Sequence, residues 1–193
     1  PAPIESLPAG TYRVQAVLDL NRENSSWRRE IGNLSSAVST ITINADTAKN
    51  PVVDLVLTKS VTAESTKPRS APGVEYFELR SELLSKFRGR DVMLRAGVVP
   101  PIEYDRARAG GYPAVYEVPG FGGNHEDARR QSRMRGTGTS PAAVLSRNAF
   151  WIVLDPEGPN GHHLFANSAN NGPVGDALVK ELIPALEKKY NLA

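Results

Sequence analysis

The segment YPAVYEVPGFGGNHEDARR, from Tyr112 to Arg130, decides the fold class of this chain. It begins with a short apolar run, continues through a glycine-rich turn and ends in a stretch with helical character. A second apolar run, FWIVL from Phe150 to Leu154, is also followed by a turn and a helical pattern. Short continuous apolar runs are typical of strands covered on both faces. The alternation of strand and helix therefore predicts an α/β sheet with right-handed crossovers.

The glycine-rich turn after the first apolar run aims backbone amides at an anion. The spacing of its residues decides which kind of anion-binding site it forms. A dinucleotide fingerprint needs a third glycine where His125 stands, counting from Gly120 and Gly122. A phosphate loop needs Gly-Lys-Ser or Gly-Lys-Thr, but Gly123 is followed by Asn124. The remaining interpretation is an oxyanion hole, in which such a turn supplies one amide.

The rest of the chain divides into two parts. Alternating apolar residues over 11–18, at Ile41 and Ile43, and from Val53 to Leu57 predict a small antiparallel β domain over residues 1–59. The polar, proline- and serine-rich stretch 60–73 is predicted to be a linker. Residues 74–193 form the α/β domain, with two more strands near 76–80 and 91–99. Its final helix begins near Pro173 and bends at Pro184.

Composition excludes several classes of function. The 23 basic and 21 acidic residues give a net charge of +2, and we predict no nucleic-acid partner. The densest basic stretch, Arg129 to Arg135, is interpreted as a solvated helix face. The sequence contains no cysteine, hence no disulfide, thiolate nucleophile or cysteine metal site.

No apolar run approaches the roughly 20 residues of a membrane-spanning helix, so no membrane partner is expected. The N-terminus has no signal-peptide pattern and no initiator Met. A removed secretion signal is one explanation, which favours a secreted or periplasmic protein but leaves the compartment open.

Three segments, in their order and spacing, resemble the esterase branch of the α/β-hydrolases, which includes esterase D-like, feruloyl and acetyl-xylan esterases. Residues 81–101, SELLSKFRGRDVMLRAGVVPP, are similar to that family's opening hairpin. Residues 113–123 resemble its third strand and oxyanion turn, and residues 150–192 its fourth strand, active-site loop and following helix. The resemblance covers about residues 76–193. Pro119 departs from it, since many members have histidine there.

This resemblance implies the first half of a mostly parallel α/β-hydrolase sheet, preceded by the small β domain. It implies an oxyanion hole built from the backbone of Phe121 and Gly122. It also implies a substrate pocket lined by Gly120 and by the asparagine-rich segment 158–173, through Asn167, Ser168, Asn170 and Asn171. The alternative for that segment is an ordinary surface loop.

The resemblance also shows what the sequence lacks. No G-x-S-x-G occurs in the chain, although the family places its nucleophile beyond the helix that contains Leu178. Ser168 is the nearest substitute, but it lacks small flanking residues on both sides. Because the acid and histidine follow the serine in this fold, the three histidines come too early in the chain to be the base. We therefore expect the triad in a complementary C-terminal half, and no hydrolysis of an ester substrate by this chain alone.

Two further interpretations stay open. His162 and His163 lie near Asp155 and Glu157, which is a possible metal cluster, but H-E-x-x-H is absent and loop residues explain the same pattern. No cofactor or metal is predicted. The alternative function is a non-catalytic module that binds carbohydrate or protein on a degenerate hydrolase scaffold.

Overall fold

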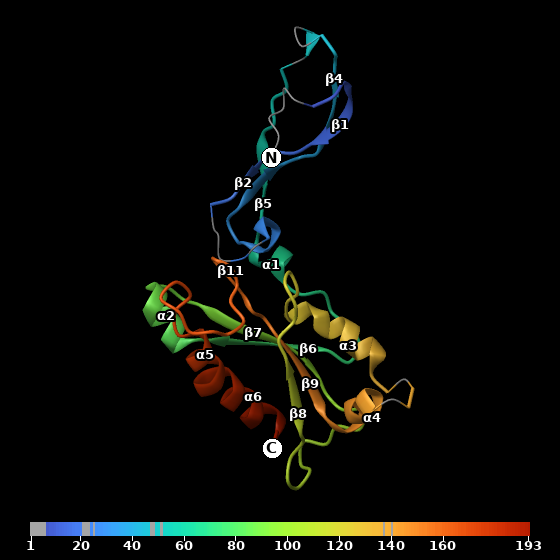
Figure 1. Ribbon diagram of the computed structural model, residues 1–193, viewed down its shortest axis with the longest axis vertical. Coiled ribbons are helices and arrows are strands. Elements are labelled where there is room, and N and C mark those ends of the chain that lie inside the picture. The colour runs from blue at the N-terminus through green and yellow to red at the C-terminus, as the bar shows by residue number, and fades with distance from the viewer. Residues whose placement is uncertain are drawn as a thin grey trace. The chain divides into compact units, whose positions relative to one another are not determined.

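The computed structural model describes residues 7–20, 24, 26–46, 49–50, 52–136, 138–139 and 141–193. The chain forms two compact units, Pro1–Lys67 and Pro68–Ala193 (Figure 1). The boundary lies inside the stretch 60–73 that we predicted as a linker, and this stretch also contains a short helix, α1 (Ala63–Thr66). No helix in the described ranges is both long and apolar enough to cross a membrane.

The first unit consists of antiparallel strands, as its alternating pattern predicts. β1 (Gly10–Val14) pairs with β4 (Ser39–Ile43), and β3 (Leu34–Ser36) lies between β2 (Val17–Leu18) and β5 (Leu57–Ser60). A short 3-10 helix covers Trp27–Arg29. The predicted strand from Thr11 to Leu18 is interrupted between β1 and β2, where the Ala16 amide donates to Ser36 Oγ at 3.0 Å. The strand predicted from Val53 onward begins only at Leu57.

The interior of the first unit is polar. Among its described residues, the buried ones are Glu30, Asn33, Ser35 and Ser36. Asn33 donates to Asp19 Oδ1 at 2.7 Å and accepts from the Leu20 amide at 2.9 Å. None of the described apolar side chains of this unit is buried, and Val52 is 96% exposed. Hydrogen bonds therefore hold this unit together to a greater degree than apolar burial does.

The second unit is built on a four-stranded sheet with the order β6-β7-β9-β8. Its strands are β6 (Glu75–Arg80), β7 (Met93–Val99), β8 (Ala114–Glu117) and β9 (Phe150–Leu154). β8 and β9 are parallel, whereas the β6–β7 and β7–β9 pairs are antiparallel. The sheet is thus mixed rather than mostly parallel. The helices between β8 and β9 return the chain to the end of the sheet at which β8 begins, so these two strands are parallel. The connection between β6 and β7 does not return the chain in this way, so that pair is antiparallel.

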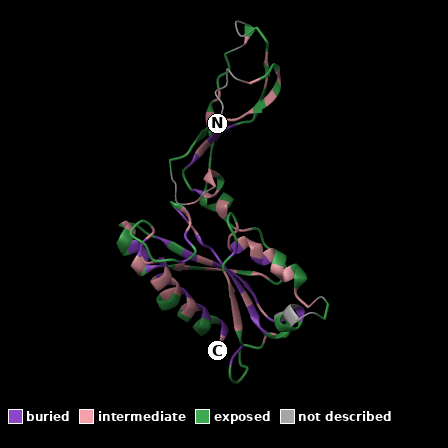
Figure 2. Cartoon of the chain, viewed as in Figure 1, coloured by how far each residue is buried: buried purple, intermediate pink, exposed green. Residues whose placement is uncertain are grey.

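Helices cover both faces of this sheet (Figure 1). α3 (Ala128–Met134) lies on one face with the short 3-10 helix His125–Asp127, and α4 (Pro141–Asn148) leads into β9. On the other face lie α5 (Val174–Ala177), a π-helical turn (Leu178–Leu182) and α6 (Ile183–Tyr190). Successive residues of β9 alternate between the two cores: Phe150, Ile152 and Leu154 pack with the larger cluster, and Val153 with Val99 and Ala128. Figure 2 shows the buried residues concentrated in this unit.

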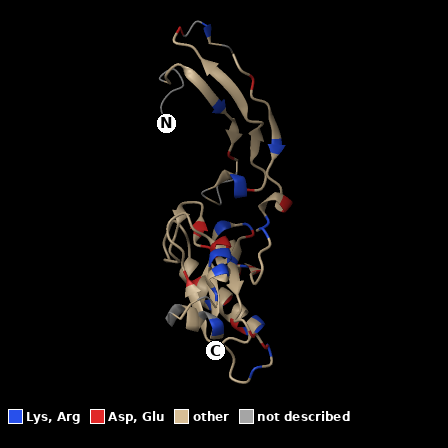
Figure 3. Cartoon of the chain, turned by 90° about the vertical axis from the view of Figure 1, so that its right-hand side faces the viewer, with Lys and Arg blue, Asp and Glu red and all other residues tan. Residues whose placement is uncertain are grey.

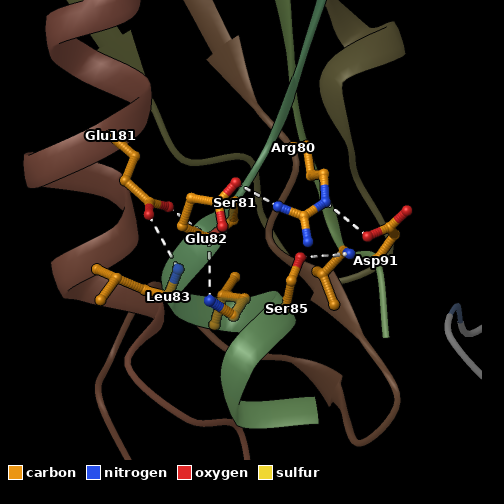
Figure 4. Close-up of polar contacts among 9 residues, drawn as sticks. Arg80, Ser81, Glu82, Leu83, Ser85, Asp91 and Glu181 are labelled. Carbon is orange, nitrogen blue, oxygen red and sulfur yellow. Dashed lines mark hydrogen bonds and ion pairs between the residues drawn. The ribbon is translucent and has the colours of Figure 1, made fainter. Parts of the chain in front are cut away.

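The segment between β6 and β7 forms a helix, α2 (Glu82–Arg88), which the sequence analysis did not predict. Ser81 caps it by accepting the Leu84 amide at 3.0 Å, and Gly89 ends it with a φ of 67°. Glu181 of the π-helical turn adds a second cap, since it accepts from the Ser81 hydroxyl and from the Leu83 amide (Figure 4). This turn ends two residues before Pro184, which lacks an amide N–H and cannot continue an α-helix regularly.

The basic stretch of α3 contacts acidic residues, and Figure 3 shows basic and acidic positions interspersed along the second unit. Arg129 pairs with Glu126 at 2.7 Å, and Arg130 lies 3.5 Å from Glu117. Glu117, the last residue of β8, also accepts from the side chains of Gln131 of α3 and Trp151 of β9, which joins α3 to these two strands. These contacts give the arginines a local structural role.

Candidate functional site

The candidate site lies where β8 and β9 end. Because the two strands are parallel, the loops that follow them, 118–124 and 155–173, leave the same edge of the sheet, the usual ligand-binding edge of α/β proteins. Two contacts join these loops. His162 Nε2 lies 2.8 Å from the Pro119 carbonyl oxygen, and His125 Nδ1 lies 2.8 Å from Asp155 Oδ2. The structure therefore brings together the two segments that the sequence singled out.

The glycine turn has free backbone donors. The Gly123 amide donates to the Gly120 carbonyl at 2.9 Å, and Gly122 has a φ of 79°, which is the mark of a type II turn. Phe121 occupies the second position, and its residue surface is 94% exposed. Neither the Phe121 nor the Gly122 amide donates a hydrogen bond to any of the described residues. The turn thus presents two adjacent N–H groups.

The base of the turn is held by buried contacts. Asn124 accepts the Glu126 amide at 2.9 Å and begins the 3-10 helix. The side chains of His125 and Asp155 are only 4% and 6% exposed, and the His125 ring also meets Tyr76 edge to face. This pair anchors the turn to the end of β9. Sequence reasoning treated His125 and Asp155 separately and did not find their contact.

The loop after β9 starts with a small hairpin of β10 (Glu157–Gly158) and β11 (Gly161–His162). Leu164 and Phe165 follow with φ values of 51° and 54°, a region that bulky residues adopt only at a cost. The strain places Phe165 in the core and leaves Leu164 68% exposed. His163 supports this geometry, since its amide donates to the Pro156 carbonyl at 2.9 Å and its Nδ1 accepts the Phe165 amide at 3.0 Å.

Stability of the second unit should fall as the pH drops below 6.5, because His163 must stay neutral to accept the Phe165 amide. Burial, and next the charge of Arg88, lower the pKa of His163 from 6.5 to about 4. The unfolded chain then binds the extra proton first, so the stability present above pH 6.5 is lost as the pH falls to about 4. We expect a loss of about 2 kcal/mol after allowance for partial solvent exposure of the ring. Urea unfolding across this pH range measures it.

His163→Asn is the matched control for that experiment. Its amide oxygen can accept the Phe165 amide but does not titrate, so its stability should change less between pH 6.5 and 4. An identical pH dependence in both proteins would assign the effect to other groups.

The asparagine-rich segment is bonded mainly to itself. Asn167 Oδ1 accepts the Gly175 amide at 2.7 Å and the Asp176 amide at 3.2 Å, so it caps α5. Ser168 pairs with Gly172 through the backbone, and its Oγ accepts the Asn171 amide at 3.0 Å. No described imidazole bonds to Ser168 Oγ. The Asn160 side chain donates to the Asn170 carbonyl at 3.3 Å and to Asn171 Oδ1 at 3.2 Å. Substrate binding by these residues, and by Gly120, stays a prediction.

The described residues contain no group of three or more His, Asp or Glu side chains able to hold a metal ion. The carboxylate of Asp155 faces His125, and its other oxygen lies 3.4 Å from the Glu157 amide. The histidines on the loop point to different partners, Pro119 for His162 and Phe165 for His163. These contacts are those of loop-forming side chains.

Comparison with known proteins finds similarity among solved structures alone. No family model matches the chain, and no curated protein matches it. A solved structure of a CE1 ferulic acid esterase from Anaeromyces mucronatus, in complex with ferulic acid, is similar at a TM-score of 0.40 and 14% sequence identity. The match covers 65% of this chain and 46% of the esterase chain. The chain thus spans less than half the length of that enzyme.

Proposed function

We propose that this chain is the N-terminal part of a serine carboxylic-ester hydrolase and that it supplies the oxyanion hole and one wall of the pocket. The observation that carries the proposal is the Gly120–Gly123 turn, whose two inner amides have no acceptor among the described residues. This turn follows β8 at the edge where ligands bind in α/β folds.

In the proposed reaction, a serine attacks the ester carbonyl while a histidine takes the serine proton. The amides of Phe121 and Gly122 donate to the oxygen that gains negative charge. Fixed donors of this kind act strongly because they need no rearrangement during the reaction. The exposed residues of the segment 164–170 form the pocket wall. The serine, its acid and its histidine come from a complementary C-terminal polypeptide.

The chain alone should not turn over 4-nitrophenyl acetate above the buffer rate, because it has no activated serine. The purified protein and its Ser168→Ala variant should give the same absorbance trace at about 400 nm, where the released 4-nitrophenolate absorbs. Turnover by the wild type that disappears in Ser168→Ala would place the nucleophile in this chain and contradict the proposal.

The oxyanion assignment is tested by Phe121→Pro in the hydrolase that contains this chain together with its catalytic half. Proline fits the second position of a type II turn, so the turn stays while one donor is removed. We expect kcat to fall by about 100-fold, in line with the loss of one oxyanion donor. Phe121→Ala is the matched control. It removes the same exposed ring but keeps the N–H, and it should lose far less.

The two variants also separate catalysis from simple contact with the ligand. If Phe121→Ala and Phe121→Pro lose activity equally, the ring and not the amide matters, and the oxyanion role is wrong.

The second candidate function, a non-catalytic binding module, is favoured by the exposed apolar side chains of the first unit: Leu20, Val52 and Val56. If these exposed apolar side chains form a binding surface, the protein should be retained on an insoluble polysaccharide through them. Retention that is lost when these three are replaced by serine would support this function, whereas no retention of the wild type would count against carbohydrate binding.

A further inference from the structure

The Gly120–Gly123 turn is not rigid by its own composition. A Cβ at Gly120 or Gly122 would meet nothing within 4 Å, so neighbouring atoms do not confine these residues, and glycine has the widest choice of backbone angles. Inside the turn, the Gly123 amide donates to the Gly120 carbonyl. This bond fixes the shape of the turn but leaves the whole turn free to swing about Gly120. A contact from outside must therefore fix the direction of its inner amides.

His162 supplies such a contact at the point where the turn begins. Its Nε2 lies 2.8 Å from the Pro119 carbonyl oxygen. Because a carbonyl oxygen can only accept, Nε2 carries the hydrogen and donates it. The Pro119 carbonyl and the Gly120 amide belong to one planar trans peptide unit, so the bond sets the plane from which the turn starts. His162 thus limits rotation at the glycine about which the turn would swing.

The imidazole of His162 stands on a fixed platform. His162 lies on β11, which pairs antiparallel with β10. The amide of the next residue, His163, donates to the Pro156 carbonyl at 2.9 Å, and the Asp155 amide donates to the Arg95 carbonyl of β7 at 3.1 Å. The small hairpin is therefore tied to the sheet on both sides of the contact, and the position of the His162 ring follows from that of the sheet.

The partner of His162 separates it from the other histidines of the site. The far end of the turn is held by the buried contact of His125 with Asp155. His163 bonds within its own loop, to the Phe165 amide two residues away. His162 instead reaches a carbonyl 43 residues earlier in the chain, in the other loop. Its side chain consequently links the loop after β9 to the start of the turn.

We propose that His162 is a positioning residue, which holds the N–H groups of Phe121 and Gly122 in one direction by donating to Pro119. Its part in catalysis rests on the proposed function, in which these donors must be fixed before charge develops on the ester oxygen. His162 acts through the backbone and does not touch the reacting atoms. The pocket wall and the turn that stabilises charge are coupled through this imidazole.

NMR relaxation of the backbone amides in the full chain tests the proposal. In the wild type, the amides of Phe121 and Gly122 should have order parameters close to the rigid-backbone value of about 0.85. In His162→Ala they should fall below about 0.6. His162→Gln should restore them, because the glutamine side-chain amide can donate to the same carbonyl.

Asn160→Ala is the matched control. It removes two side-chain hydrogen bonds from the same loop, to Asn170 and Asn171, and leaves the contact with Pro119 in place. The order parameters of the turn should therefore stay as in the wild type. The amides of β9 report in every spectrum that the second unit is folded.

Unchanged order at Phe121 and Gly122 in His162→Ala, with β9 still ordered, would overturn the positioning role. In the complete hydrolase of the proposed function, His162→Ala should lower kcat by about tenfold at unchanged KM, and His162→Gln should restore it. A turn that loosens in His162→Ala without any change in kcat would uphold the positioning of the backbone and contradict the oxyanion function. The failure of one proposal is thus distinguishable from the failure of the other.

Discussion

Gly97→Ala should destabilise the second unit by about 3 kcal/mol, which is at the upper end for an added methyl group in a packed core. A Cβ at Gly97 would lie 2.1 Å from the His125 carbonyl oxygen and 2.5 Å from the Ala128 Cβ. The first neighbour is backbone, so it cannot rotate away. The 3-10 helix and α3 would have to move off β7, and the His125–Asp155 contact would move with them.

Gly120→Ala is the matched control, because a Cβ there meets nothing within 4 Å and the residue has no positive φ. It should change stability by less than about 0.5 kcal/mol. Urea unfolding followed by Trp151 fluorescence, in a Trp27→Phe background, reports on the second unit alone. Equal stability of the two variants would mean that the 3-10 helix is not fixed against β7.

The strands of the second unit were predictable because their signals are local. The apolar run of β9 is buried on both faces and has the predicted bounds of Phe150 and Leu154, whereas the residues of β8 are only half-buried. Strand direction is not local. β6 and β7 pair antiparallel although α2 joins them, and the sheet is mixed. The α2 helix itself had a readable signal, the capping serine Ser81 before Glu82 and two leucines, which the resemblance to a hairpin obscured.

The site was predictable only in part, for the same reason. The glycine turn is a local motif, and its free amides agree with the expectation for Phe121 and Gly122 without testing their role. The anchor between His125 and Asp155 joins residues that lie far apart in the sequence, and no spacing rule reveals it. Gly97 inside a strand pattern was the available signal, since an isolated strand glycine often marks a close approach of backbone. Asn167 caps a helix, a contact that the sequence did not predict, and its expected place in the pocket stays a prediction.

Phe150→Ala should cost the second unit about 4 kcal/mol, within the usual range for a buried aromatic residue. Phe150 is fully buried, and its ring lies 5.0, 5.8 and 5.5 Å from the rings of Tyr104, Tyr112 and Tyr190. β9 is paired on both sides, so the backbone cannot collapse into the space that is left.

Removal of the Phe150 ring should also weaken the pairing of Tyr112 with residues 191–193, because Tyr190 immediately precedes these residues. We therefore expect Phe150→Ala to speed amide exchange at Tyr112 and Ala193 beyond the effect of lower global stability. Phe121→Ala removes an equally large ring from a 94% exposed position and should change neither quantity by more than about 0.5 kcal/mol. If Phe150→Ala lowered stability while exchange at Tyr112 and Ala193 followed global unfolding alone, residues 191–193 would be held by the Asn191 side chain, which donates to two backbone carbonyls, rather than by the aromatic cluster.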